Sequence, residues 1–194
     1  MAERTGGAGP HIRGGGGIGS GPLSHGLPSS GATSRSLATT LRNRWVAGVA
    51  VVSVLDEDGG FRGVSVSSVV VVSIEPPIVA LALSSDGSVH RLFVNGTMFA
   101  ISMLDRSRTF PADRFAGRAP VPDAAFTGVP HVVHASGVPV IEGAIGWCVA
   151  AVTQVIPAGD HVLILGEVQD GATPEDTDDP LVTYEGRYRA LEAE

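Results

Sequence analysis

The sequence predicts a mainly β domain that folds as a closed or nearly closed antiparallel barrel with two short helices. The first observation behind this prediction is that at least six apolar runs rich in β-branched residues have strand length, with turn residues between them. The second is that charged residues make up only 17% of the chain, against 43% hydrophobic residues. This low charged fraction indicates that much of the surface is buried and fits a chain with an oligomer interface.

The chain divides into a tail and one folded domain. Residues 1–36 are rich in Gly, Ser and Pro, so they are predicted to be a disordered tail that cannot bury enough apolar area to offset its ordering entropy. Gly14, Gly16 and Gly19 have the spacing of a dinucleotide-binding fingerprint, but no strand precedes them and no helix can begin at the following Gly21-Pro22. Residues 37–194 are long enough for one domain with a hydrophobic core.

The first half of this domain is predicted to consist of strands joined by turns. Residues 41–55 end in a buried-strand composition, and the acidic, glycine-containing stretch 56–60 predicts a hairpin turn to a second strand at 61–66. An apolar run at 69–74 leads to Pro76 and Pro77, which break any ladder because proline has no N–H to donate. Residues 78–83 form the third predicted strand.

Two helical segments and two long strands are predicted in the second half. A short helix is expected from Ser88, as its N-cap, through about Phe93, with a stop signal at Asn95-Gly96. Residues 99–104 form a fourth strand, and the helical pattern of 105–116 is expected to begin at Pro111. The rest is a loop at 117–138, long strands at 140–156 and 161–168 with a turn at 157–160, an acidic loop at 175–179, and closing segments at 181–184 and 186–189.

Charge and cysteine content exclude several classes of function. The net charge of −7 and the pI near 5.3 argue against a nucleic-acid or anionic-membrane surface, since both require basic patches. The single cysteine, Cys148, cannot form an internal disulfide, so nothing indicates an oxidising compartment. The N-terminus has no apolar signal segment and no run approaches the roughly 20 apolar residues of a membrane span, so the chain is predicted to be cytoplasmic.

No self-contained catalytic constellation is visible in the sequence. His131 and His134 lie in a Pro-flanked loop, which does not predict a metal site, and there is no nucleophile elbow or Walker-type loop. Cys148 lies beside Trp147 on an apolar strand and is expected in the core rather than as a nucleophile. We therefore predict no metal, and any enzyme of this kind would borrow a cofactor.

Two serine-rich segments are the best candidates for holding a cofactor. One is 63–68, at a strand end, and the other is 84–88, at the predicted start of the short helix. Hydroxyls and free N–H groups at a helix start form an anion site that suits a phosphate, and the helix dipole adds a few tenths to about 1 kcal/mol. The alternative is that these serines only cap the helix and form turns.

Several motifs along residues 37–191 resemble the flavin reductase-like, FMN-binding split-barrel family. The most distinctive is Gly63-Val64-Ser65-Val66-Ser67-Ser68, a spacer of six residues, and then Glu75-Pro76-Pro77-Ile78-Val79. Further matching segments are 99–104, 137–144, 159–161, 166–168, 180–184 and 186–189. The resemblance is strongest to the short-chain reductase components of two-component flavin-dependent monooxygenases, and it implies a Greek-key-like antiparallel split barrel.

This resemblance implies a homodimeric NAD(P)H:flavin oxidoreductase. The nicotinamide C4 would stack over the isoalloxazine and pass hydride to flavin N5, so catalysis would rest on positioning two rings about 3 to 3.5 Å apart. The reduced flavin would then leave or pass to a partner monooxygenase. The flavin would be FAD or FMN, and NADH is expected over NADPH because no Arg pair for a 2′-phosphate stands out.

The resemblance also implies roles for individual residues. His161 is expected on the nicotinamide side as the catalytic residue, with a structural strand-end histidine as the alternative. Arg108 could pair with a phosphate or be a solvated surface arginine, and Tyr188 is a weaker candidate for the nicotinamide side. The residues expected to contact flavin are Gly63, Val64, Ser65, Ser67, Ser68, Ala82, Leu83, Ser84, Ser85 and Ser102, with Ser88 and Val89 near its phosphate.

Two departures from the family pattern and two rival functions stand beside this interpretation. Asp86 lies in a stretch that often carries Asp-Arg-Ser-Ser in relatives, and a carboxylate near a phosphate is unfavourable unless it points away. The segment after Leu104 lacks the Gln common in relatives.

The rivals are an oxidase that retains its flavin on the same barrel and a non-enzymatic flavin-binding or structural module.

Overall fold

A computed structural model describes residue 31 and residues 33–118, 125–175 and 179–191. The compact unit discussed below spans Ser34–Glu194. Its first helix, α1 (Ser34–Arg44), begins within the segment predicted to be a tail. Residues 1–30 and 32 lie outside the described residues, so the disordered tail stays a prediction.

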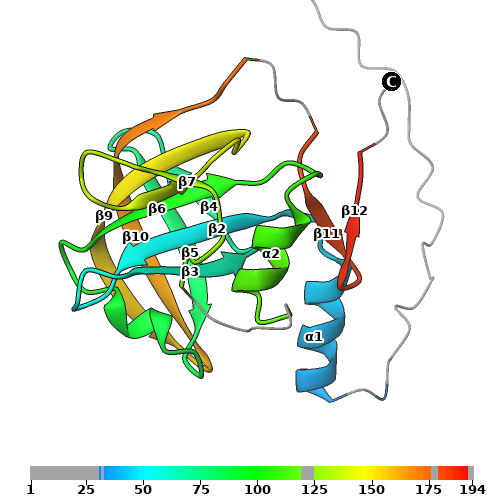
Figure 1. The fold of residues 1–194 in the computed structure, drawn as a ribbon. Helices are drawn as coiled ribbons and strands as arrows, with labels where there is room; N and C mark the ends of the chain where they lie inside the picture. Colours follow the sequence, from blue (N-terminus) through cyan, green and yellow to red (C-terminus); the bar gives the residue numbers. More distant parts are fainter. Residues whose placement is uncertain (1–30, 32, 119–124, 176–178, 192–194) are drawn as a thin grey trace, which may run out of the picture. The chain divides into compact units, whose positions relative to one another are not determined.

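The main element is one antiparallel sheet of seven strands (Figure 1). Its order is β3-β2-β6-β9-β10-β5-β4, so the two late strands β9 and β10 lie side by side between strands from the first part of the domain. The strands are β2 (Ala50–Leu55), β3 (Phe61–Val66), β4 (Val70–Ser73), β5 (Ile78–Ser84), β6 (Met98–Met103), β9 (Gly146–Ala158) and β10 (His161–Ala172).

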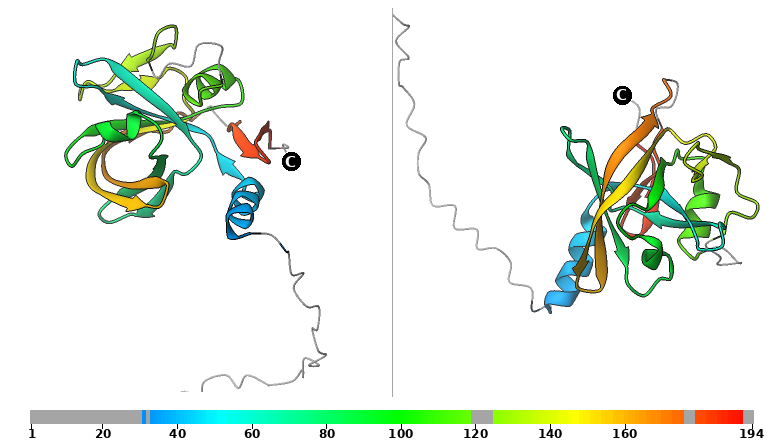
Figure 2. Two further views of the ribbon diagram at one scale, coloured as in Figure 1. Left: turned by 90° about the horizontal axis from the view of Figure 1, so that it is seen from below. Right: turned by 90° about the vertical axis from the view of Figure 1, so that its left-hand side faces the viewer.

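This sheet curves around a hydrophobic core, as β9 and β10 show in the left view of Figure 2. Leu81, Phe99 and Ile164, from β5, β6 and β10, are fully buried inside it. The curvature brings β3 into contact with β5, but β3 and β4 at the two edges are not hydrogen-bonded to each other. The predicted antiparallel barrel is therefore confirmed as a fold that stays open between its edge strands.

The β2–β3 hairpin shows how local sequence fixes one connection. The Asp56 N–H donates to Gly60 O at 2.8 Å, and Asp56 Oδ1 accepts from the Gly60 N–H at 2.6 Å. Gly59 has φ +77°, a conformation that glycine adopts without a Cβ clash. The turn predicted at 56–60 is confirmed.

Smaller elements surround this sheet. A three-stranded sheet joins β1 (Ala47–Gly48), β11 (Val182–Tyr184) and β12 (Arg187–Arg189), and a hairpin joins β7 (His131–Val133) to β8 (Pro139–Ile141). Within the described residues, the helical elements besides α1 are the 3₁₀ turn η1 (Val89–Leu92) and α2 (Thr109–Phe115). None of the helices in the described part of the chain is both long and apolar enough to cross a membrane.

Several predicted boundaries were wrong in the first half. Residues 41–44 belong to α1, and the strand expected up to Leu55 is interrupted at Val49. The Val49 N–H donates to Leu181 O at 2.9 Å, so a contact with the distant C-terminal segment separates β1 from β2. The short helix after Ser88 is a 3₁₀ turn of four residues, and the Ser88 side chain makes no capping hydrogen bond.

Other boundaries were wrong in the second half. α2 begins at Thr109 rather than at Pro111, because proline in a first turn lacks only an N–H that needs no helical partner. The predicted loop at 117–138 contains β7, and the strand expected from 140 to 156 is split into β8 and β9. The acidic loop predicted at 175–179 falls mostly on residues 176–178, which lie outside the described residues.

Candidate functional site

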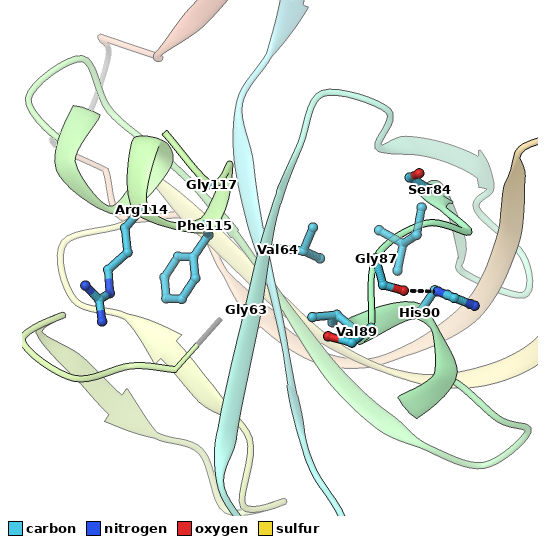
Figure 3. Close-up of a pocket in the computed structure, with 11 residues that line it drawn as sticks. Gly63, Val64, Ser84, Gly87, Val89, His90, Arg114, Phe115 and Gly117 are labelled. Atoms are coloured by element: carbon cyan, nitrogen blue, oxygen red, sulfur yellow. Dashed lines mark hydrogen bonds between the residues drawn. The ribbon is translucent and has the colours of Figure 1, made fainter. Parts of the chain in front are cut away.

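A pocket of about 420 Å³ lies where β3, the end of β5, the segment leading into η1, and α2 come together (Figure 3). Figure 3 shows Val64 near its centre, with Phe115 and Arg114 on one side and Ser84, Val89 and His90 on the other. Its lining residues are Gly63, Val64, Leu83, Ser84, Gly87, Ser88, Val89, His90, Arg114, Phe115 and Gly117. The volume lies within the range of small-molecule sites, about 300–1,000 Å³.

Gly63 allows α2 to pack directly onto β3. A Cβ at this position would lie 2.7 Å from the Phe115 ring, closer than side-chain carbons approach one another. The Phe115 side chain is buried in a cluster with Phe126, at a ring-centroid distance of 4.8 Å. The pocket wall is therefore built by a glycine backbone against an aromatic ring.

Among the serines expected to contact flavin, those of the first segment bond to the protein itself. Ser65 Oγ donates to Ala112 O in α2 at 2.7 Å. Ser68 Oγ donates to Ala82 O at 3.0 Å and accepts from the Ala82 N–H at 3.1 Å. Ser67 is exposed, and none of these three serines nor Ala82 lines the pocket.

The second serine-rich segment contributes more of the lining. Of the residues of this segment expected to contact flavin, Leu83, Ser84, Ser88 and Val89 line the pocket and Ser85 does not. Ser84 Oγ accepts from the Asp86 N–H at 3.3 Å, which forms a local turn. Because η1 has only four residues, the helix-dipole argument for an anion site here was wrong.

His161 begins β10 and lies directly opposite Ser84 in the pairing with β5. Its Nδ1–H donates to Asp160 Oδ1 at 2.7 Å, and this hydrogen bond, followed by the imidazole charge, lowers the pKa of the Asp160 carboxyl. The Asp160 carbonyl accepts from the Ser85 N–H at 3.0 Å, which fixes the β9–β10 turn to the serine-rich segment. His161 is not itself among the residues that line the pocket.

Three other predicted site residues lie away from the pocket. Ser102 is fully buried and its Oγ accepts from the Ile141 N–H at 3.0 Å, so it joins β6 to β8. The Arg108 guanidinium packs over Gly143, and its buried Nε lies 3.7 Å from Asp105 Oδ2. Both side chains therefore make contacts within the protein, and the flavin contact expected of Ser102 and the phosphate contact considered for Arg108 stay predictions.

The third is Tyr188, in β12. Its hydroxyl donates to Asp113 Oδ1 at 2.7 Å, and burial together with this carboxylate raises the pKa of Tyr188 to about 12. The Arg118 guanidinium lies 6.0 Å from the centre of the Tyr188 ring. This cluster holds the C-terminal strands against α2 rather than opening into the pocket.

Sequence reasoning missed His90, Arg114, Phe115 and Gly117 as lining residues, whereas Gly87 lies within the predicted segment 84–88. His90 stands beside the predicted Ser88 and could have been included from that proximity alone. The α2 residues had no such local signal, because only the packing of α2 onto β3 places them here. Within the described ranges, no group of three or more His, Cys, Asp or Glu side chains is arranged to hold a metal ion.

A family model matches most of the domain. The model described as the flavin reductase like domain matches residues 42–192. The actinorhodin polyketide dimerase of Streptomyces coelicolor is 36% identical over 145 residues, covering 75% of this chain and 80% of that protein. The NADH-dependent flavin reductase StyB of Pseudomonas fluorescens is 31% identical over 147 residues, covering 74% of this chain and 82% of that protein.

Solved structures share the fold over a similar length. The NADH:FAD oxidoreductase SgcE6 of Streptomyces globisporus, in complex with NAD and FAD fragments, superposes with a TM-score of 0.73 at 27% identity, covering 82% of this chain and 93% of that chain. The styrene monooxygenase flavin reductase of Pseudomonas putida S12 superposes with a TM-score of 0.71 at 28% identity, covering 81% of this chain and 98% of that chain.

Proposed function

The chain belongs to the flavin reductase-like domain family, and from this premise we propose how its pocket serves an NADH:flavin oxidoreductase. The reaction is the reduction of FAD or FMN by NADH, and the reduced flavin is supplied to a partner monooxygenase. The relatives support each part: one is a NADH-dependent flavin reductase, one is an NADH:FAD oxidoreductase, and one is the flavin reductase of a styrene monooxygenase.

The pocket between β3 and α2 is the proposed flavin site, and one observation carries this assignment. Six of the residues expected to contact flavin line a single pocket although they come from two distant segments: Gly63, Val64, Leu83, Ser84, Ser88 and Val89. Apolar side chains and a glycine backbone suit a flat ring system, and the hydroxyls suit a polar tail. These features fit a flavin nucleotide.

A bound flavin supplies the hydride acceptor, which no amino-acid side chain provides. The contribution of the protein is to hold two rings against each other and to keep water out between them. Val64, Val89 and Phe115 present apolar surface for this purpose, and Val89 and Phe115 are buried. Hydride transfer requires no acid or base in the pocket, and none of the described lining residues carries a carboxylate.

His161 is the residue proposed to contact the nicotinamide. Residues directly opposite in an antiparallel pair place their side chains on the same face of the sheet, so His161 lies on the face that Ser84 occupies. Because Nδ1–H is donated to Asp160, Nε2 is the ring nitrogen that can meet a ligand. A carboxamide can donate to a neutral Nε2 or accept from a protonated one.

A homodimer is proposed on the evidence of β4. This strand is an edge of the main sheet, and Val70, Val71 and Val72 are 52%, 61% and 52% exposed. An exposed apolar edge strand is a site for pairing with another chain. β4 carries no charged side chain, although its pairing with β5 has a register shift between Val71 and Ser73. A second copy of this chain covering β4 would bury that surface.

Steady-state oxidation of reduced nicotinamide tests the proposed function. The purified full chain is mixed with NADH or NADPH and with FMN, FAD or riboflavin, and absorbance in the nicotinamide band is followed. Rapid oxidation of NADH only when flavin is added is the expected result. A lack of oxidation with every flavin would overturn the proposal, and full activity of a yellow protein that added flavin does not stimulate would favour a flavin-retaining oxidase.

A further inference from the structure

We propose that Arg114 pairs with a phosphate group of the nucleotide bound in the pocket, either that of the flavin or that of the nicotinamide cofactor. This inference rests on the proposed function, because it requires that the pocket hold a nucleotide. The family resemblance leaves phosphate pairing open for Arg108, at the start of α2, and this pairing belongs instead to Arg114 in the same helix. The observations that carry it are the position of Arg114, its fixation and the charge of its surroundings.

Arg114 lies at one end of the pocket. Figure 3 shows Arg114 and Phe115 on one side of Val64, with Ser84 and His90 on the other. Among the described residues that line the pocket, Arg114 alone carries a permanent positive charge. Figure 3 draws the Arg114 guanidinium beyond the Phe115 ring, so a nucleotide that extends past this ring would meet a guanidinium at one end and serine hydroxyls at the other.

The guanidinium is held in place by contacts on both sides of Arg114. Its Nε–H donates to Ala125 O at 3.3 Å, and among the described residues its two Nη atoms have donors available for a ligand. The preceding residue, Asp113, accepts the Tyr188 hydroxyl, and the following residue, Phe115, is buried against Gly63. A guanidinium fixed in this way can bind a phosphate through two parallel hydrogen bonds with little loss of side-chain entropy.

Electrostatics favour this end of the pocket for a phosphate. The chain carries a net charge of −7, so an anionic ligand needs a local cation. At the other end, Asp86 belongs to the same turn as Ser84 through the hydrogen bond from its N–H to Ser84 Oγ. A phosphate at that end would be placed near a carboxylate and without a helix dipole to compensate, since η1 is a single short turn.

Arg108 provides the matched control. It is an arginine at the N-terminal boundary of the same helix, but its guanidinium packs over Gly143 near Asp105 and does not line the pocket. Replacing either arginine with glutamine removes one positive charge and keeps a similar side-chain length. A difference between the two variants therefore reports position rather than net charge.

The test compares phosphate-bearing substrates with phosphate-free analogues in the full chain. KM is measured for FMN against riboflavin, and for NADH against 1-benzyl-1,4-dihydronicotinamide, in the wild type, Arg114→Gln and Arg108→Gln. Arg114→Gln should raise KM about tenfold for a phosphate-bearing substrate and less than about twofold for its analogue, in line with the loss of one charged hydrogen-bond pair. The pair that shows this selective loss identifies the nucleotide, and Arg108→Gln should change neither ratio.

Arg114→Lys keeps the positive charge but lacks the planar guanidinium, so it should retain part of the preference for phosphate-bearing substrates. This partial rescue distinguishes loss of the phosphate contact in Arg114→Gln from a folding defect. Unchanged KM ratios in Arg114→Gln, or an equal loss for substrates with and without phosphate, would overturn the assignment of Arg114. An inactive wild type would instead remove the proposed function itself, so the two failures are distinguishable.

Discussion

His161 and Ser84 lie directly opposite each other in the antiparallel pairing of β10 with β5. The hydrogen bond from the Ser85 N–H to Asp160 O continues this pairing into the turn, so the position of His161 is fixed relative to the wall of the pocket. The histidine to which the family resemblance gives a nicotinamide role is thereby held at the edge of the pocket that we assign to the flavin.

His161→Ala should raise KM for NADH about tenfold while the Kd for flavin changes by less than about twofold, because His161 borders the pocket without lining it. Asp160→Asn should give a smaller effect in the same direction, since it removes the carboxylate that receives Nδ1–H and leaves the imidazole in place. Steady-state kinetics and flavin titration measure the two quantities. A parallel loss of NADH use and flavin affinity in His161→Ala would contradict this role.

Gly63→Ala should weaken flavin binding and destabilise the fold by about 1–3 kcal/mol, because the new Cβ would lie 2.7 Å from the Phe115 ring. Gly166→Ala should destabilise to a similar extent, since its Cβ would lie 2.6 Å from the buried Phe99 ring, but should leave flavin affinity unchanged. Gly48→Ala, with no atom within 4 Å of the added Cβ, is the neutral control. Denaturant unfolding measures the stability of each variant, and flavin titration measures its affinity. Equal flavin affinity in Gly63→Ala and Gly166→Ala would contradict the assignment of Gly63 to the wall of the flavin pocket.

Ser102→Ala and Ser84→Ala should have opposite profiles. Loss of Ser102 leaves the buried Ile141 N–H without its acceptor and should cost about 1–3 kcal/mol of unfolding free energy with little effect on KM for flavin. Loss of Ser84 should change stability little and raise KM for flavin, because Ser84 is exposed and lines the pocket. A kinetic defect in Ser102→Ala at full stability would show that this serine does contact the flavin.

Tyr188 should make folding stability depend on pH in the alkaline range. Its raised pKa means that the folded state favours the neutral phenol, so its contribution is complete below about pH 10 and is lost as the pH rises toward about 12. The chain has two tyrosines, so ultraviolet titration of the wild type and Tyr188→Phe isolates this group. A Tyr188 that ionises near pH 10 would show that its contact with Asp113 does not persist in solution.

Val71→Glu should convert the proposed dimer into a monomer, because it places a charge on the exposed edge strand β4. Mass from light scattering after size-exclusion chromatography checks this. Val132→Glu, which also replaces an exposed valine but lies in the β7–β8 hairpin, is the matched control and should leave the mass unchanged. A wild type that is monomeric at micromolar concentration would contradict the assignment of β4.

Elements with strong local signals could be predicted from the sequence. The hairpin at Asp56 was predictable because an acidic residue and glycines determine the turn within five residues. Its strand β3 has the predicted bounds, and β5 extends the prediction only by Ser84. Boundaries set by distant contacts were not predictable, and the break at Val49 shows why, since its partner Leu181 lies near the other end of the chain.

The same distinction applies to the site. The sequence identified two serine-rich segments, but whether a hydroxyl faces a ligand or the backbone depends on packing. Ser65 is turned to Ala112 and Ser68 to Ala82, while Ser84 faces the pocket. Both Arg108 and Arg114 were visible in one helical segment, and only the packing of Phe115 onto Gly63 decides which of them reaches the pocket.

A crystal structure of this chain soaked with FMN tests the central claim most directly. The account predicts difference density for the ring system between Val64 and Val89, with one ring face open toward His161. If Arg114 serves the flavin, the phosphate of FMN should lie within hydrogen-bond distance of its guanidinium. An empty pocket closed by its own side chains, with FMN bound elsewhere or not at all, would contradict it.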